Sequence, residues 1–309
     1  MKVAFIFDGQ GGSKESLGQD FYKNNEFVHD FIEEHSYLFN MNKKIYNTNP
    51  VDLTTEELQP AIFLYETAVA RLLEKNGIVA DATAGSSLGE YSSLCYANIL
   101  NVKDTLAILK KRSKLMREHL LNFNSGMKAI MFLDKEIVEE CVKKFDDCEI
   151  SNVNSPNQVI ISGLRNELEL CASMCVEMGA RKVIDLNVDG AFHSKFLEKA
   201  STEFLEYIKD FNYGKGNKSV YFNYTGNNLK TDISELLSKQ LYSKVLFCNI
   251  IENMLEDGID TFYEIGPGGN LGFHINSIAR LKGKKIKVYQ ISDYESYCNL
   301  IEKREGEAV

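Results

Sequence analysis

The sequence predicts an α/β protein in which a large domain with a largely parallel sheet carries a small inserted subdomain. Short β-like runs alternate with helical runs along almost all of the 309 residues, which is typical of a parallel sheet covered by helices. Residues 125–189 follow the order β-α-β-β-α-β, which is the ferredoxin-like pattern. A G-x-S-x-G pentad at 85–89 lies between a short strand and a helix, as in α/β-hydrolase-like domains. We therefore expect residues 1–124 and 190–309 to form the large domain and 125–189 the small one.

The large domain is expected to begin with a buried strand at 2–7, because KVAFIF is almost entirely apolar. Apolar positions at helical spacing predict a helix over 60–75, and the small residues 80–84 form the strand before the pentad. A helix over 90–100 follows the pentad. The next helix, over 102–121, is amphipathic and basic on one side.

The remaining elements are predicted in the same way, from apolar residues at helical spacing for the helices and from short apolar or alternating runs for the strands. In the small subdomain we expect strands at 126–133, 149–153, 158–162 and 181–188, with helices at 135–145 and 167–178. After it we expect helices at 195–211 and at 233–247 running on to 256, with strands at 219–224, 261–265 and 285–291. The charged tail from residue 302 is expected to be frayed.

Composition excludes several classes of protein. A net charge of −9 argues against a nucleic-acid-binding role. The apolar start is too short for a signal peptide, and no apolar run approaches the roughly 18 residues of a membrane span. The seven cysteines are odd in number, and none has the spacing of a metal site; Cys171 and Cys175 are expected to pack on one helix face. These features predict a cytoplasmic protein without a bound metal.

The pentad predicts a nucleophile elbow. Gly85 and Gly89 are needed because the turn is too tight for a Cβ, and they leave the Ser87 hydroxyl raised at its tip. The helix that follows directs backbone N–H groups and the positive end of its dipole toward a developing oxyanion.

A serine nucleophile needs a base, and five histidines compete for that role. His29, His35 and His119 lie in charged helical stretches and are expected at the surface. His193 is the best candidate, because it lies in the loop 189–194 where the small subdomain rejoins the large one and ligand sites concentrate. A structural role for His193 stays open, and His274, after a glycine-rich loop, is the alternative base.

Eight motifs together carry a family resemblance that extends from the first strand to about residue 290. The chain resembles the malonyl-CoA:acyl carrier protein transacylases and the acyltransferase domains of polyketide synthases. The motifs are Gly9-Gln10-Gly11, Gln59-Pro60-Ala61, GSSLGE (85–90), Arg112-x-x-x-Met116, VNSPNQVIISG (153–163), GAFHS (190–194), Gln240-Leu241-Tyr242 and EIGPGGNL (264–271).

The resemblance implies the catalytic groups. Ser87 would attack the thioester of an acyl-CoA, and His193 would be the general base, steadied by the main-chain carbonyl of Gln240 rather than by an acid. The N–H groups of Gln10 and Leu88 would form the oxyanion hole.

The resemblance also implies the substrates. Arg112 would bind the free carboxylate of a malonyl group, and the bulky Phe192 would fill the space that an α-methyl group needs. The substrates would be malonyl-CoA and the phosphopantetheine arm of an acyl carrier protein, in fatty-acid or polyketide synthesis. The resemblance implies no bound cofactor, and the chain is expected to be a monomer.

This chain departs from the family pattern at a few positions. Ser86 replaces the usual histidine, Asp8 a proline, Lys244 a proline and Phe247 a tryptophan, and the first loop reads GQGGS. Because Ser86 is next to the nucleophile, its change leaves open a substituted malonyl group such as aminomalonyl, transferred by a stand-alone enzyme of polyketide or nonribosomal peptide assembly. A non-catalytic relative that only docks carrier proteins is the third possibility, and the intact Ser87, His193 and Arg112 argue against it.

A carrier protein is acidic, so this acidic chain would need a local basic rim to bind it. The candidate residues of this rim are Lys110, Lys111, Lys114, Lys195 and Lys244.

Overall fold

The computed structural model describes residues 2–10, 17–36, 53–228 and 232–307. Gly11, Gly12 and Ser13 of the first glycine loop lie outside the described residues. The chain forms two compact units: Met1–Lys110, Tyr213–Tyr221 and Met254–Val309 make the first, and Lys111–Asn212 with Phe222–Asn253 make the second. The domain limits at 124/125 and 189/190 stay a prediction.

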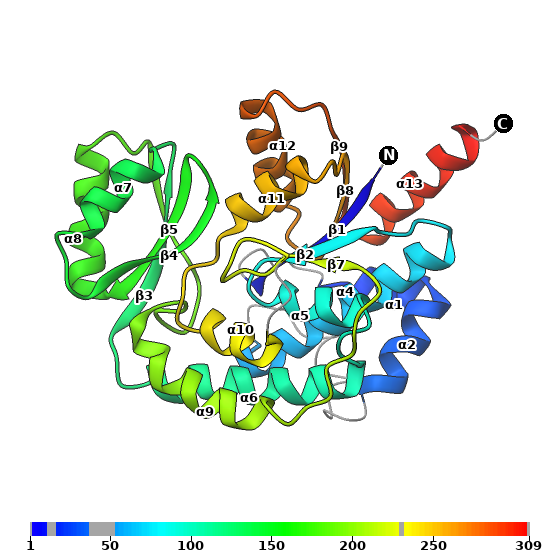
Figure 1. Ribbon diagram of the computed structural model, residues 1–309, viewed down its shortest axis with the longest axis horizontal. Helices are drawn as coiled ribbons and strands as arrows, with labels where there is room; N and C mark the ends of the chain where they lie inside the picture. The colour runs from blue at the N-terminus through cyan, green and yellow to red at the C-terminus, as the bar shows by residue number, and fades with distance from the viewer. Residues whose placement is uncertain (1, 11–16, 37–52, 229–231, 308–309) are drawn as a thin grey trace. The chain divides into compact units, whose positions relative to one another are not determined.

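A five-stranded sheet in the order β7-β2-β1-β8-β9 is the centre of the first unit, and all its strand pairs are parallel (Figure 1). Its strands are β1 (Val3–Phe7), β2 (Ala82–Gly85), β7 (Ser219–Val220), β8 (Thr261–Ile265) and β9 (Lys287–Ile291). Every residue of β1 is buried, as expected for the apolar central strand of a parallel sheet.

The strand order predicts a site at the carboxyl ends of the central strands of this sheet. Phe7, the last residue of β1, pairs with Gly85 of β2 on one side and with Ile265 of β8 on the other. The carboxyl ends of three strands, one of which leads into the pentad, therefore lie side by side. The chain passes to opposite sides of β1 for β2 and for β8, and ligands bind at such switch points in open α/β sheets.

The helices of the first unit include one long buried helix. They are α1 (Gln19–Asn24), α2 (Glu26–Ser36), α4 (Thr55–Lys75), α5 (Gly89–Tyr96), α12 (Leu271–Leu281) and α13 (Tyr294–Glu307), and α6 (Val102–Leu120) continues into the second unit. α4 begins five residues before the predicted start, because Thr54 and Glu57 form a capping box and Pro60 is accommodated inside the helix. The tail was expected to fray from residue 302, but α13 continues to Glu307, since its Glu, Lys and Arg residues favour a helix.

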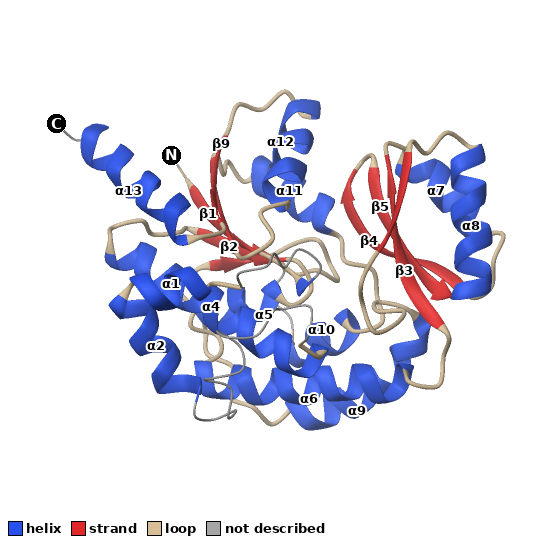
Figure 2. Ribbon diagram, turned by 180° about the vertical axis from the view of Figure 1, so that it is seen from behind, coloured by secondary structure: helices blue, strands red, loops and turns tan. Residues whose placement is uncertain are grey.

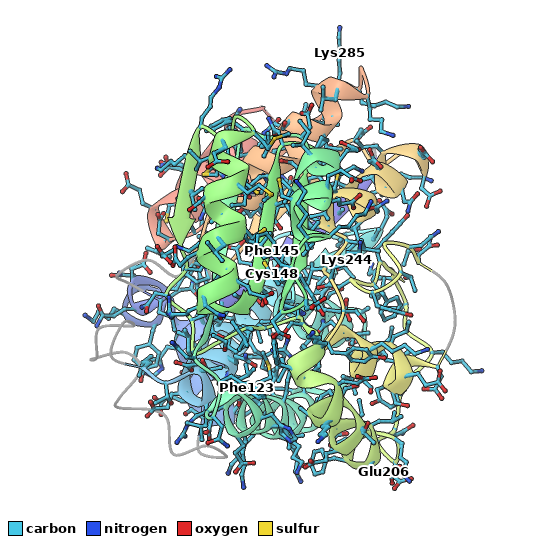
Figure 3. All side chains as sticks on the ribbon, turned by 90° about the vertical axis from the view of Figure 1, so that its left-hand side faces the viewer. Phe123, Phe145, Cys148, Glu206, Lys244 and Lys285 are labelled. Carbon is cyan, nitrogen blue, oxygen red and sulfur yellow. The ribbon has the colours of Figure 1, made fainter. Side chains whose placement is uncertain are left out.

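The second unit contains the ferredoxin-like arrangement that the sequence predicts. β3 (Ser125–Met131), β4 (Cys148–Ser155), β5 (Gln158–Leu164) and β6 (Lys182–Asp185) form an antiparallel sheet in the order β4-β5-β3-β6, with α7 (Lys135–Val142) and α8 (Arg165–Glu177) packed on it (Figures 1 and 2). Cys148, Cys171 and Cys175 belong to its apolar core, and the partly buried Phe145 packs against that core; Cys148 and Phe145 are labelled in Figure 3. The predicted α/β class is confirmed.

One predicted helix is wrong. The sequence predicts a helix from 233 to 256, but α10 (Ile233–Gln240) ends before α11 (Phe247–Glu256) begins. Between them the Val245 N–H donates to the Ser151 carbonyl (2.8 Å) and the Val153 N–H donates to the Val245 carbonyl (3.0 Å). This segment therefore pairs with the edge of β4, and the tertiary hydrogen bonds override the apolar periodicity that suggested one helix. The short helix η4 (Lys195–Leu197) and α9 (Glu198–Ile208) complete the second unit.

Among the described helices, none combines the length and the apolar content that crossing a membrane requires.

Candidate active site

Ser87 lies on a strained turn between β2 and α5. Its φ is 52°, in the left-handed region that few residues other than glycine adopt. A Cβ on Gly85 would overlap the backbone of Gly89, and a Cβ on Gly89 would overlap the carbonyl oxygens of Phe7 and Asp8. Both glycines are thus required by close backbone approach, and the turn has the geometry of a nucleophile elbow.

The start of α5 lies immediately after Ser87. Leu88 is the N-cap residue of this helix, and the N–H groups of Gly89 and Glu90 donate to the carbonyls of Ser86 (3.0 Å) and Ser87 (3.3 Å). These two N–H groups therefore already have acceptors, and what the start of the helix offers to an anion is its positive dipole end. An anion formed on a group attached to Ser87 would meet this end of α5.

Gln10 is fixed beside the elbow by its side chain. Its Nε2 donates to Oγ1 of Thr55 (3.0 Å), and its Oε1 accepts from Nε2 of Gln59 (3.2 Å), both on α4. A Cβ on the preceding Gly9 would be 2.8 Å from the Ser86 carbonyl oxygen, so only glycine lets this loop approach the elbow so closely. The anchoring by Thr55 was not foreseen, because only tertiary structure brings Thr55 to the loop.

Ser86 is buried at the same place. Its N–H donates to the Phe7 carbonyl (3.0 Å), and its Oγ would be 3.6 Å from a Cβ on Gly9. The serine that replaces the usual histidine is thus packed against the glycine loop.

In the second unit, His193 contacts the residue that the sequence analysis assigned to it. Its Nδ1 is 2.8 Å from the main-chain carbonyl oxygen of Gln240, and the imidazole is buried. Since a carbonyl only accepts hydrogen bonds, Nδ1 carries the proton of the neutral ring and Nε2 is left with its lone pair. This is the tautomer that a general base needs.

The end of α10 makes this carbonyl available. Gln240 is the last residue of the helix, and the last four carbonyls of a helix have no acceptor role within it. The break that contradicts the predicted helix is therefore what frees the Gln240 oxygen for His193.

The loop that carries His193 is held by serines of the small sheet. The Ser162 Oγ of β5 donates to the Phe192 carbonyl (2.9 Å), and the Ala191 N–H donates to Oγ of Ser125 in β3 (3.1 Å). His193 itself has a φ of 55°, a second strained position at a candidate catalytic residue. Phe192 is buried, at 6% exposure.

Arg112 is fully buried on α6, and its Nη2 donates to Oε1 of Gln240 (3.2 Å). One residue thus contacts the candidate base with its backbone and the candidate carboxylate-binding group with its side chain. Burial, and secondarily the positive charge of Arg112, lower the pKa of His193 to about 4, so the imidazole is neutral at neutral pH. The role of the Gln240 side chain was missed, because the family pattern assigns only the carbonyl.

A cavity of about 610 Å³ in the second unit is lined by His193. Its walls include Ile150 of β4, Tyr224, Tyr242 and Lys244, and Lys244 is labelled in Figure 3. Of the five lysines proposed as a basic rim, Lys244 lines this cavity. Lys195 forms an ion pair with Asp147 (2.9 Å), Lys114 with Glu118 (3.7 Å), and Lys111 lies over the Tyr207 ring.

The structure thus groups the candidate residues into two sets. Ser87, Leu88, Gln10 and Ser86 lie together in the first unit, and His193, Gln240, Arg112 and Phe192 lie in the second. The alternative base, His274, is buried in α12 of the first unit, where burial lowers its pKa to about 4. No group of three or more His, Cys, Asp or Glu residues suited to a metal ion occurs in the described part of the chain.

Comparison with known proteins agrees with this arrangement. The family model "Acyl transferase domain" matches residues 4–286. The chain is 31% identical over 304 residues to the malonyl CoA-acyl carrier protein transacylase of Bacillus subtilis (strain 168), covering 96% of this chain and 95% of that protein. It is 33% identical over 288 residues to the protein of that name from Staphylococcus aureus (strain MRSA252), covering 90% and 93%.

Solved structures have the same fold. A malonyl CoA-acyl carrier protein transacylase from Clostridium perfringens superposes with a TM-score of 0.91 at 32% identity, covering 100% of this chain and 99% of that one. A malonyl-transacylase solved in complex with a type II PKS acyl-carrier protein gives a TM-score of 0.92 at 25% identity, covering 98% and 100%.

Proposed function

The chain belongs to the acyl transferase domain family, and we propose that it transfers malonyl groups from coenzyme A to the phosphopantetheine thiol of an acyl carrier protein. The observation that carries this choice of acyl group is Arg112. A fully buried guanidinium, hydrogen-bonded to the residue that holds the candidate base, is suited to grip a carboxylate with two parallel bonds. A plain acyl group offers no such carboxylate.

In the first half-reaction, Ser87 Oγ attacks the thioester carbonyl of malonyl-CoA while Nε2 of His193 accepts the hydroxyl proton. The C–S bond then breaks, and the imidazolium returns the proton to the departing coenzyme A thiolate. This leaves a malonyl ester on Ser87. In the second half, the carrier thiol gives its proton to His193 and attacks the ester, and Ser87 regains its proton as its C–O bond breaks.

Both tetrahedral intermediates carry an oxyanion. We propose that the backbone N–H groups of Gln10 and Leu88 bind it, one from the glycine loop and one from the start of α5. The anchoring of the Gln10 side chain on α4 supports this role, since a donor must be fixed before charge develops. Loss of one such donor costs about 3 kcal/mol of transition-state stabilisation.

Arg112→Ala is expected to weaken malonyl transfer far more than acetyl transfer, because acetyl has no carboxylate to bind. Removal of one partner from a buried charge pair costs roughly 2–5 kcal/mol, which corresponds to a loss of about 30-fold or more in the ratio of the two kcat/KM values. The test compares malonyl-CoA and acetyl-CoA as donors on the same variant, so partial loss of folded protein cancels. Equal losses for both donors would exclude the carboxylate-binding role and, with it, the choice of malonyl.

The acyl group is identified by intact-protein mass spectrometry after the protein is mixed with a panel of acyl-CoAs, because the added mass is characteristic of the group bound to Ser87. Methylmalonyl is expected to be rejected by about 1–3 kcal/mol, the scale on which a pocket discriminates one methyl group, because we expect Phe192 to fill the space that the α-methyl group needs. A strong preference for a substituted malonyl over malonyl would favour the aminomalonyl alternative.

Lys244→Glu is expected to raise the KM for the carrier protein and to reduce its salt dependence, with a smaller change in acylation from coenzyme A. Lys244 is exposed and lines the cavity that contains His193, where an acidic carrier would deliver its arm. Lys209→Glu is the matched control, since Lys209 is an exposed lysine of the same unit that does not line this cavity. Identical KM values for both variants would assign carrier docking to apolar contacts instead.

We also propose that the protein acts as a monomer in the cytoplasm. Both sets of candidate residues come from a single chain, and all seven cysteines are free thiols, which fits a reducing compartment. Light scattering coupled to size-exclusion chromatography measures the oligomeric state directly.

A further inference from the structure

A buried carboxyl group lies directly before the glycine loop. Asp8 follows β1, is 2% exposed, and stands where the resembling family usually has proline. Its Oδ2 accepts hydrogen bonds from the N–H groups of Gly268 (2.7 Å) and Gly269 (3.1 Å). The side chain of Asp8 thus joins the start of the Gly9-Gln10 loop to the turn that follows β8.

A second buried carboxyl group binds the residues that directly follow this turn. Glu264 of β8 accepts from the N–H groups of Leu271 (2.6 Å) and Gly272 (2.8 Å) at the start of α12, and from Nε2 of Gln290 (2.8 Å). In the sheet, Glu264 pairs with Ile6, two residues before Asp8. The segment from 268 to 272 is therefore bound by two buried acids, one that follows β1 and one that belongs to the adjacent strand β8.

Two ionised carboxylates so close together in a buried site are unfavourable. Burial and the charge of Glu264 raise the pKa of Asp8 well above its ordinary value, although the two glycine N–H groups oppose this. Glu264 accepts three hydrogen bonds, whereas Oδ1 of Asp8 is buried with no hydrogen-bond partner among the described residues. A bare anionic oxygen costs more in such a place than a neutral one, so the proton belongs on Asp8.

The other titratable groups that face Asp8 act in the same direction. They belong to α4, where burial raises the pKa of the Glu66 carboxyl group and of the Tyr65 phenol well above the ordinary values, and a negative charge on Asp8 adds to both shifts. Glu66 Oε2 accepts from Oγ of Ser92 (2.5 Å). Loss of the Asp8 proton would therefore add a negative charge beside two further buried carboxyl groups, those of Glu264 and Glu66.

We propose that Asp8 is a positioning residue for acyl transfer, which in its protonated form fastens the glycine loop to the Gly268-Gly269 turn. Ionisation would strengthen the two glycine hydrogen bonds, but it would also leave a negative charge on the buried, unpartnered Oδ1 beside Glu264. Repulsion and the need to solvate this charge then displace the loop and misplace Gln10. This inference rests on the proposed function in one respect, namely that Gln10 supplies an oxyanion donor. It concerns a residue of this chain that replaces the family's proline, which cannot titrate. Acyl transfer therefore gains a pH dependence on the alkaline side that does not come from His193.

Asp8→Asn is the test variant, because asparagine has the same shape, keeps an oxygen that accepts from both glycine N–H groups, and is neutral at every pH. The wild-type rate of Ser87 acylation should fall toward alkaline pH, and the rate of Asp8→Asn should match the wild type at neutral pH without that fall. Asp8→Ala should lower kcat on the order of 10-fold or more with little change in KM, because it misplaces a donor whose full loss costs roughly 100- to 1000-fold.

Asp81→Asn is the matched control. Its Oδ2 accepts from the N–H of Val3 (2.8 Å), so it makes the same kind of bond at the opposite end of β1. This variant should keep the wild-type pH profile. An alkaline fall in Asp8→Asn equal to that of the wild type, or a wild-type kcat in Asp8→Ala, would overturn the proposal.

Urea unfolding provides a readout that needs no substrate. Above the ordinary carboxyl pKa near 4, the native state binds more protons at Asp8 than the unfolded chain does, so the free energy of unfolding falls as pH rises. The Asp8→Asn variant should show a smaller fall, because the part that Asp8 contributes is removed while the buried Glu66, whose pKa is also raised, keeps its own part. If the fall is absent in the wild type, the protonated Asp8 is wrong; if it is present but malonyl-CoA leaves no acyl group on Ser87, only the proposed function fails.

Discussion

Ser87→Ala is expected to abolish acyl-enzyme formation while leaving the fold intact. The hydroxyl group is the atom that bonds to the acyl group, and loss of a serine nucleophile in comparable enzymes lowers kcat by about 10⁶-fold. Alanine has the same Cβ as serine and meets the same backbone strain at a φ of 52°. Intact-protein mass spectrometry after incubation with malonyl-CoA should show the added acyl mass on the wild type and none on the variant.

Ser86→Ala provides the control, because it removes the neighbouring hydroxyl from the same turn. That variant should still acquire the acyl group. Acylation of the Ser87→Ala protein would assign the nucleophile to another residue and the elbow to a structural role.

His193→Ala should slow acylation by on the order of 10⁴- to 10⁶-fold, because nucleophile and base act as a unit. The structure offers a close control in His274→Ala, since His274 is also a buried histidine whose pKa is lowered to about 4. Stopped-flow measurement of the first half-reaction separates the two variants. A slow His274→Ala with a normal His193→Ala would transfer the role of base to His274.

The pH dependence of acylation follows from the same histidine. Its pKa of about 4 lies below the ordinary 6.5, so the neutral, basic form is present across the physiological range. The rate should rise with pH through about 4 and stay level through neutral pH, and the alkaline fall that is attributed to Asp8 should follow only above that plateau. Between 4 and 6.5 the unfolded chain binds more protons at this residue, so its contribution to stability is lost as pH falls through that window.

The sequence predicts well those elements that depend on residues close to one another in the chain. The pentad fixes the elbow because Gly85, Ser87 and Gly89 determine one turn by their own sterics, and the ferredoxin-like order follows from short-range periodicity. The break between Gln240 and Phe247 was missed because it depends on Val245 pairing with β4, a contact nearly a hundred residues away in sequence. The early start of α4 was missed because Pro60 is typical of a first helical turn, whereas the capping box at Thr54 decides the boundary.

In the candidate site, too, the sequence predicts the local features and misses the contacts between distant segments. Motifs located Ser87, His193, Arg112 and Gln240, since each stands in a short pattern of its own. The mutual support of these residues could not be read from the sequence. The hydrogen bond from Arg112 to the Gln240 side chain and the anchoring of Gln10 on α4 join segments that only the folded chain brings together.

The double use of Gln240 has an evolutionary consequence. The candidate base His193 is hydrogen-bonded to a backbone carbonyl group, which every amino acid supplies, whereas Arg112 is hydrogen-bonded to the side-chain amide of Gln240. Mutation at position 240 can therefore alter which acyl groups are accepted without depriving His193 of its support. If Arg112 and His193 have the proposed roles, acyl selectivity can change at position 240 while the hydrogen bond that orients the imidazole is kept.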